Sequence, residues 1–343
     1  MVLFLSLLIT EGDKYILGST SEGEVHVWLF SDLLLEFLKE KIEKETLFSS
    51  ICKFSFKDGP IQNLALFEKG IESLFFNDET SIYGYSWPEI LDEIKERKNL
   101  GQPSTKVTKF KSNPKRLYNI LQNNSNENER IQCVDYDHSQ NRCFIGTNRG
   151  HVLIIDLKEM KLIKRVSPVK NSILLDESVV SINAIRFFQN NSFIYGNSRG
   201  NLELYDYEAQ KPIKVFKLEK DSLSLVKFIQ FEIDQKWVVV GHNDYITRWH
   251  VQSGNLDSAL PISSDVNYIF PTDDVIYTAH NDNQILNWES NGELLGKFEA
   301  SAASVTAIAG KVEGKDRILV IGGNSPIIDL YVNSHRIFSY VAN

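Results

Sequence analysis

Hydrophobic runs that alternate with short polar turns occupy most of the chain. In the stretch VVVGHNDYITRWHVQSG, residues 238–254, a run of valines predicts a buried strand that stops at Gly241. Residues 242–244 have the composition of a turn, and residues 245–250 form a second run in which apolar and polar positions alternate. The stretch therefore predicts a β-hairpin with one face turned toward a core.

The hairpin pattern is repeated along the chain. GTNRGHVLIID from Gly146 and GNSRGNLELYD from Gly196 match in spacing residue for residue, and looser copies begin at Gly18, Ala279 and Gly322. Each copy has a β-rich strand that ends in a small residue, a polar turn, and an apolar alternation. The last apolar position is a bulky landmark, namely Trp28, Ile155, Tyr205, Trp249, Trp288 or Tyr331. In the C-terminal half these landmarks recur roughly every 40 residues, the period expected of a propeller blade.

A further strand precedes most copies and another follows, so each unit predicts a small antiparallel sheet of four strands. Such a sheet alone leaves one face wet, and it becomes stable when like units stack face to face in a ring. A degenerate seventh unit lies between Gly59 and Trp87. We therefore expect an all-β, seven-bladed β-propeller that forms a single domain over residues 1–343. Blade one should start near Val2, blade seven should end near Ala342, and apolar packing between blades should supply most of the cohesion.

Two insertions interrupt the predicted blades. In blade one, residues 31–46 contain SDLLLEFLKEKIEKE, which has helical periodicity with Ser31 as a cap and Leu34, Leu38 and Ile42 along one stripe. This stripe either packs back on the propeller or binds a helix of a partner protein.

The second insertion, residues 88–129, is expected between blades two and three. It begins with a helix over residues 88–99, which has Pro88 at its start and Gly101 after its end. The asparagine-rich NNSNENE near the end of the insertion is expected to be disordered.

A basic stretch, KVTKFKSNPKR, lies between that helix and the asparagine-rich tract. Its cations are the candidate contacts for RNA, namely Lys106, Lys109, Lys111, Lys115 and Arg116. Phe110 and Tyr118 are available to stack on bases. The alternative is a solvated loop that binds nothing.

The polar turns between the second and third strands should leave the same face of the disc. They form a candidate protein-binding rim, whose members are Asn148, Arg149, Ser198, Arg199, Asn243, Asp244, Asn281 and Asp282, with Asn324 and Ser325 in the last unit. The rim is basic on blades three and four and acidic on blades five and six, an arrangement that suits an oriented protein partner. The alternative is that these residue types are present because turns require them.

A hydrolase is the competing class, since His242 and His280 lie in the turns GHND and AHND, each close to an aspartate. However, both histidines occupy equivalent positions of the repeat, as turn residues do, whereas a single active site breaks a repeat. The chain also lacks HExxH, a phosphate loop and metal-ligand spacing. We therefore expect no enzymatic activity, no cofactor and no metal.

Charge and cysteine content restrict the partners and the compartment. The 37 lysine and arginine residues against 45 acidic residues leave a formal charge of −8, so no global field attracts nucleic acid and any RNA contact has to be local or indirect. Cys52, Cys133 and Cys143 form no CxxC pair, which indicates buried thiols in a reducing compartment. The opening VLFLSLLIT lacks a basic leader and a cleavage site, so it predicts a strand and not a signal sequence.

The repeated unit resembles that of WD-repeat propellers, with the terminal dipeptide changed to Ile155-Asp156 and Tyr205-Asp206 in the two best copies. At a finer level the chain resembles the THO complex subunit 6 family of the nuclear transcription–export machinery. The resemblance depends on FKDGPIQNL, SWPEILDEI, DVIYTAHNDNQILNWESNGEL and the terminal ILVIGGNSPIIDLYVNSHRIFSY, which follow one another in the family's order.

That resemblance implies a nuclear, non-enzymatic scaffold that binds coiled-coil THO subunits, contacts RNA indirectly or weakly, and supports mRNA processing and export. A generic WD-repeat adaptor in ubiquitin ligation or trafficking is the alternative. Members of the family usually have an additional segment before the first strand, whereas this sequence starts directly on that strand. We therefore expect no strand to join the two ends, and ring closure to depend on side-chain packing.

Overall fold

The computed structural model describes residues 3–10, 12, 14–30, 47–99, 108–110, 112–121, 128–168, 180–217, 224–243, 245–262, 265–272 and 274–342. The expected helix with Leu34, Leu38 and Ile42 lies outside the described residues. Lys106, Lys111, Asp244 and nearly all of the asparagine-rich tract also lie outside them.

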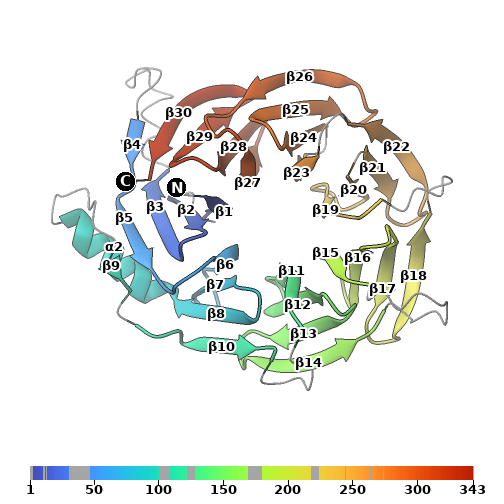
Figure 1. The fold of residues 1–343 in the computed structure, drawn as a ribbon, viewed down its shortest axis with the longest axis horizontal. Coiled ribbons are helices and arrows are strands. Elements are labelled where there is room, and N and C mark those ends of the chain that lie inside the picture. The colour runs from blue at the N-terminus through green and yellow to red at the C-terminus, as the bar shows by residue number, and fades with distance from the viewer. Residues whose placement is uncertain are drawn as a thin grey trace.

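Seven small sheets surround a central axis, with the first strand of each sheet innermost and the last at the circumference (Figure 1). Blade one is β1 (Phe4–Ile9), β2 (Tyr15–Thr20), β3 (Glu24–Leu29), β5 (Cys52–Ser55) and β9 (Thr108–Lys109). Blade two is β6 (Gln62–Phe67), β7 (Ser73–Asn77), β8 (Ser81–Ser86) and β10 (Arg116–Asn119). Blade three is β11 (Ile131–Asp137), β12 (Arg142–Thr147), β13 (Val152–Asp156) and β14 (Lys161–Val166).

The remaining blades follow the same order. Blade four is β15 (Ile182–Phe187), β16 (Ser192–Asn197), β17 (Leu202–Asp206) and β18 (Lys211–Phe216). Blade five is β19 (Phe228–Phe231), β20 (Trp237–Gly241), β21 (Tyr245–His250) and β22 (Leu256–Pro261). Blade six is β23 (Val266–Pro271), β24 (Val275–His280), β25 (Gln284–Glu289) and β26 (Leu294–Glu299). Blade seven is β27 (Val305–Glu313), β28 (Asp316–Gly323), β29 (Ile327–Val332), β30 (His335–Val341) and β4 (Leu47–Ser49). The expected seven-bladed, all-β propeller is confirmed.

Apolar packing joins each blade to the next. Seven clusters of buried side chains lie one at each interface between neighbouring blades, the interface of blades seven and one included. Between blades four and five, for example, the rings of Phe216 and Trp249 meet edge to face at 5.7 Å. Burial of this kind stabilises by roughly 25 cal/mol per Å² of apolar surface, so the stacked faces hold the ring together.

The same stacking explains the small residue that ends the second strand of the repeat. A Cβ atom on Gly196 would lie 2.2 Å from a methyl group of Val226 in the next blade, and one on Gly146 would lie 2.6 Å from a methyl group of Ile182 in the next blade. The following turn requires a second glycine, because Gly150 and Gly200 have φ angles of 74° and 78°. The two glycines of the repeat therefore have separate causes, close packing and backbone geometry.

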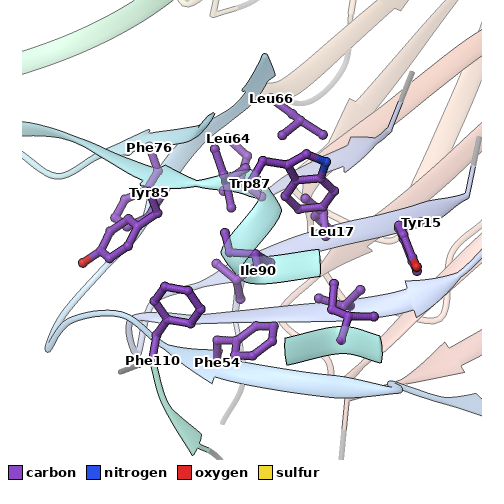
Figure 2. Packing of buried hydrophobic residues seen from close by; sticks show 14 of the residues in the cluster. Tyr15, Leu17, Phe54, Leu64, Leu66, Phe76, Tyr85, Trp87, Ile90 and Phe110 are labelled. Atoms are coloured by element: carbon purple, nitrogen blue, oxygen red, sulfur yellow. The ribbon is translucent and has the colours of Figure 1, made fainter. Parts of the chain in front are cut away.

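Helix α2 (Trp87–Asn99) confirms the helix predicted for residues 88–99. Its Ile90 and Ile94 pack into the core between blades one and two (Figure 2). No helix among the described residues is long and apolar enough to cross a membrane.

The second insertion lies within blade two, and its predicted place between blades two and three is wrong. Strand β10 pairs antiparallel with β8, with Tyr118 opposite Ile82, and forms the outer strand of blade two. Upstream in the same insertion, β9 pairs in parallel with β5 of blade one. The insertion therefore completes one blade and extends another.

Ring closure also differs from expectation. Strand β4, which lies between β3 and β5 in the chain, pairs in parallel with β30 of the last blade, with Phe48 opposite Tyr340. Ser50 N donates a hydrogen bond to Val341 O at 3.1 Å, and Trp28 Nε1 donates to the same oxygen at 3.3 Å. The expectation that no strand joins the two ends is wrong, because a segment inside blade one supplies it.

Candidate protein-binding face

The turns between the second and third strands share one face of the disc, because strand direction alternates outward from the axis in the same way in each blade. In blades three to seven the described residues of these turns are 148–151, 198–201, 242–243, 281–283 and 324–326. The structure thus brings the described candidate rim residues to equivalent positions around one face.

Most polar side chains of this rim make hydrogen bonds inside their own blade. Asn148 Oδ1 accepts from Arg130 N at 2.8 Å, and Asn324 Oδ1 accepts from Ser304 N at the same distance. In blade four, Ser198 Oγ accepts from Ser181 N at 3.2 Å. These bonds tie each turn to the segment before the first strand, so the residues shape the face whether or not a partner binds there.

The remaining rim residues make similar bonds. Asn243 N donates to Ser224 Oγ at 3.3 Å, and Asn281 Nδ2 donates to Asp265 Oδ2 at 3.2 Å. Asp282 Oδ1 accepts from Gln284 N at 3.0 Å.

The two rim arginines also have backbone bonds within their turns. The backbone N–H of Arg149 donates to Thr147 Oγ1 at 3.2 Å, and that of Arg199 donates to Asn197 Oδ1 at 2.9 Å. The turns are thus fixed through the backbone, and the two half-buried arginines lie at equivalent positions on adjacent blades. Two cations held on fixed turns provide an oriented positive patch on blades three and four.

Beneath the blade-three turn lies a buried ionic network that the sequence pattern did not reveal. The carboxylate of Glu129, whose side chain is 0% exposed, contacts Thr147 Oγ1 at 2.9 Å, His151 Nδ1 at 2.8 Å and Arg165 Nη2 at 3.1 Å. Burial raises the pKa of Glu129, but the bonds from His151 and Thr147 and the charge of Arg165 outweigh it and lower the pKa below its ordinary value. The carboxylate therefore stays ionised and locks the turn that carries Arg149. In the sequence, the only sign of this network was an acidic residue just before the first strand of blade three.

The two histidines considered for catalysis have structural roles. Both are buried, and His242 Nε2 lies 3.2 Å from Thr247 Oγ1, which also accepts from Trp249 Nε1 at 2.8 Å. In blade six, Thr278 Oγ1 lies 2.9 Å from His280 Nε2 and accepts from Trp288 Nε1 at 3.0 Å. Each histidine thus helps a threonine to hold the landmark tryptophan. Among the described residues no three His, Cys, Asp or Glu side chains gather in a way that would hold a metal ion.

The central axis holds a cavity of about 240 Å³ lined by the inner strands, with Asn63, Gln132, Asn183, Arg186 and Gln230 among its polar residues. Arg186 Nε donates to Gln230 Oε1 at 3.1 Å, and its Nη1 lies 3.4 Å from Asp135 Oδ1. Burial raises the pKa of Asp135, while Arg186 opposes the shift. These contacts link the inner strands of blades three, four and five.

The basic segment does not present its aromatic side chains. Phe110 is 6% exposed and packs edge to face against Phe54 at 5.6 Å (Figure 2). Tyr118 is 3% exposed in the core between blades two and three. The expectation that they are available to stack on RNA bases is wrong. Of the cations, Lys109 and Lys115 are exposed, and Lys115 Nζ lies 3.0 Å from Glu89 Oε1. Arg116 Nη1 donates to Ser73 Oγ at 2.9 Å.

Among known proteins, a THO complex subunit 6 homolog of Danio rerio is 23% identical over 336 residues, which cover 96% of this chain and 92% of that protein. The human THO complex subunit 6 is 24% identical over 110 residues, 31% of this chain and 32% of its own length. Nucleolar protein 10 of Xenopus tropicalis is 23% identical over 182 residues, 52% of this chain and 26% of that protein. No protein-family model matches the chain.

Among solved structures, the WD40 β-propeller domain of Doa1 superposes with a TM-score of 0.65 over 97% of this chain and 94% of that chain. The sequence identity is 13%, so this likeness establishes the fold alone. The chain thus has a WD40-type propeller fold, and its sequence resembles one THO complex subunit 6 homolog along nearly its whole length.

Proposed function

We propose that the chain is a non-enzymatic scaffold subunit of a THO-type complex in the nucleus, where it supports mRNA processing and export through protein contacts. The observation that carries the proposal is the similarity to a THO complex subunit 6 homolog over 96% of the chain. The buried histidines support it as well, because the residues that suggested hydrolysis hold tryptophans in place. The partial likeness to nucleolar protein 10 favours the same compartment.

The proposed dock for the coiled-coil THO subunits is the turn face, with Arg149 and Arg199 as its charged anchors. Acidic positions on a partner helix would meet these cations, while Asp282 on blade six would repel the same helix in the reversed orientation. Surface charges of this kind chiefly govern partner choice and association rate.

Affinity purification of the tagged chain, with quantification of co-purifying proteins, tests the proposal. THO subunits should be recovered in near-stoichiometric amounts, and Arg149→Glu combined with Arg199→Glu should reduce their recovery several-fold. Lys158→Glu with Lys236→Glu is the matched control, because these exposed lysines lie on turns of the opposite face. Recovery of ubiquitin-ligase or trafficking proteins in place of THO subunits would favour a generic WD-repeat adaptor.

RNA contact in this proposal is indirect, or weak and electrostatic, through Lys106, Lys109 and Lys111. With Phe110 and Tyr118 buried, base stacking by these two rings does not contribute. Neutralising the three lysines should therefore lower a salt-sensitive affinity for RNA and reduce its salt slope. An affinity that does not respond to salt would contradict this part of the proposal.

A further inference from the structure

Among the described residues, two blades carry a fifth strand, and both added strands lie at the same place. In blade seven, β4 pairs in parallel with β30 opposite Tyr340 and Val341. In blade one, β9 pairs in parallel with β5 opposite Phe54 and Ser55. Tyr340 and Phe54 occupy equivalent positions in their blades. Each pairs with a third-strand residue that lies three positions before the landmark: Tyr340 with Ile328, before Tyr331, and Phe54 with Val25, before Trp28. The end of the fourth strand is thus a site of strand addition that this fold uses twice.

Blade four has the equivalent edge without an added strand. Three positions before the landmark Tyr205 lies Leu202, which pairs with Phe216 of β18. The residues that correspond to Tyr340 and Val341 are therefore Phe216 and Lys217. Among the described residues, no strand pairs with the outer edge of β18.

The exposure of the bulged residue differs between an outer edge that carries an added strand and one that does not. The outer strands of blades seven and four have a β-bulge at the same place, which leaves Ile337 and Ile213 without a direct partner on the third strand. Ile337 is 9% exposed and belongs to the apolar cluster against which Phe48 of β4 packs. Ile213 is 52% exposed, and Val215, on the same outer strand, is 40% exposed. The covered edge buries its bulge residue, and the uncovered edge leaves an isoleucine and a valine in water.

Charge indicates what would cover the blade-four edge. Residues 211–217 contain Lys211, Lys214 and Lys217 and no acidic residue, and none of these lysines forms an ion pair with a described residue. In blade six the position of Lys217 is taken by Glu299, and in blade five by Pro261, where the backbone lacks a donor. The blade-four edge therefore suits an acidic strand.

Lysine, proline and bulges also protect free edges from pairing, so the same features could serve only to prevent aggregation. Blade seven argues against that reading, since β30 has the bulge and still pairs with β4 beyond it. Pro212 lies on the other side of the bulge from Phe216. It therefore does not obstruct strand pairing at Phe216 and Lys217.

We propose that the outer edge of β18 is a docking site for an extended, acidic segment of a partner protein. The segment pairs in parallel as a fifth strand across Phe216 and Lys217, covers Ile213 and Val215 with apolar side chains, and places carboxylates beside Lys211 and Lys217. This edge lies on the circumference and not on the turn face, so the two proposals can fail independently.

The test measures binding of a fluorescein-labelled octapeptide of alternating glutamate and valine to the full chain by fluorescence anisotropy. We expect saturable binding that weakens at least tenfold in a Val215→Glu, Lys217→Glu double variant of unchanged melting temperature. Lys297→Glu, at the position of Val215 in blade six, is the matched control and should bind as the wild-type chain does. Methylating alternate amide nitrogens of the peptide should also weaken binding at least tenfold, because it removes strand pairing and keeps every charge.

Equal binding of the N-methylated peptide, or of an octapeptide of alternating lysine and valine, would overturn the proposal. So would an unchanged affinity in the double variant. A labelled decauridylate that competes for the same residues would assign the edge to RNA, and concentration-dependent dimerisation lost in the double variant would assign it to a second copy of the chain.

Discussion

Phe48 lies opposite Tyr340 in a parallel strand pair, with ring centroids 6.1 Å apart, although the two residues come from opposite ends of the chain. Through this pair a segment inside blade one becomes the outermost strand of blade seven. Closure of the propeller thus depends on a short strand that belongs to neither terminus.

Phe48→Ala should destabilise the closure. We expect a loss of about 1–3 kcal/mol in the free energy of unfolding, below the range for fully buried phenylalanines because this ring is half-buried. Hydrogen exchange of the β30 amides should accelerate. Phe188→Ala is the control, since Phe188 stacks on Phe231 at 5.3 Å far from the closure and should leave β30 exchange unchanged. Unaltered β30 exchange in the Phe48 variant would show that β4 does not hold the ring.

Glu129→Gln should make stability less dependent on pH. Because the folded-state pKa of Glu129 is lowered, its ionised form contributes stability that is fully present above the ordinary glutamate pKa of 4.5 and is lost as the pH falls through the lower folded value. The variant should be less stable than the wild type by about 1–3 kcal/mol at pH 7, and the difference should shrink below pH 4.5. Urea unfolding at a series of pH values measures this. The exposed Glu293→Gln variant should follow the wild type throughout, and a difference that grows toward acid would refute the assignment.

Thr247→Val should destabilise blade five without a change in side-chain volume. It leaves the indole N–H of Trp249 and the ring of His242 without their shared hydroxyl, which costs about 1–3 kcal/mol for each unsatisfied buried group. Thr278→Val should have a comparable effect in blade six, because the same contacts recur there. Denaturant unfolding of both variants checks this. Turnover of an ester or phosphoester panel that disappears in His242→Ala would instead support a catalytic role.

Phe110→Ala should unfold the chain more readily, with little direct effect on RNA. Its ring packs against Phe54, so we expect a loss of about 3–5 kcal/mol, the range for buried phenylalanines. Leu117→Ala is the matched control in the same segment, because Leu117 is 50% exposed and should change stability by less than about 0.5 kcal/mol. Thermal unfolding of both variants decides the matter. Unchanged stability in the Phe110 variant, combined with weaker RNA binding, would restore the stacking role.

Local rules explain what could be predicted of the candidate site. Turn chemistry placed Arg149 and Arg199 at equivalent positions of the repeat, and the structure carries both on one face. The same rules could not show that Asn148 and Asn324 bind backbone groups of the preceding segment, since that segment is distant in the chain. Nor could they show the ionic network of Glu129, because its partners His151 and Arg165 lie on two later segments.

The sequence by itself determined the repeated hairpin, the blade count and the landmark residues. These features depend on strand alternation, on turn chemistry and on the small residue that ends the second strand. Each of these acts over a few neighbouring positions, and their repetition along the chain makes the pattern recognisable in the sequence. Only the tertiary structure decided that β4 closes the ring, that β10 completes blade two, and that Phe110 is core. Each of these depends on which distant edge or face a segment meets, and that choice is made by packing between parts of the chain that no local pattern relates.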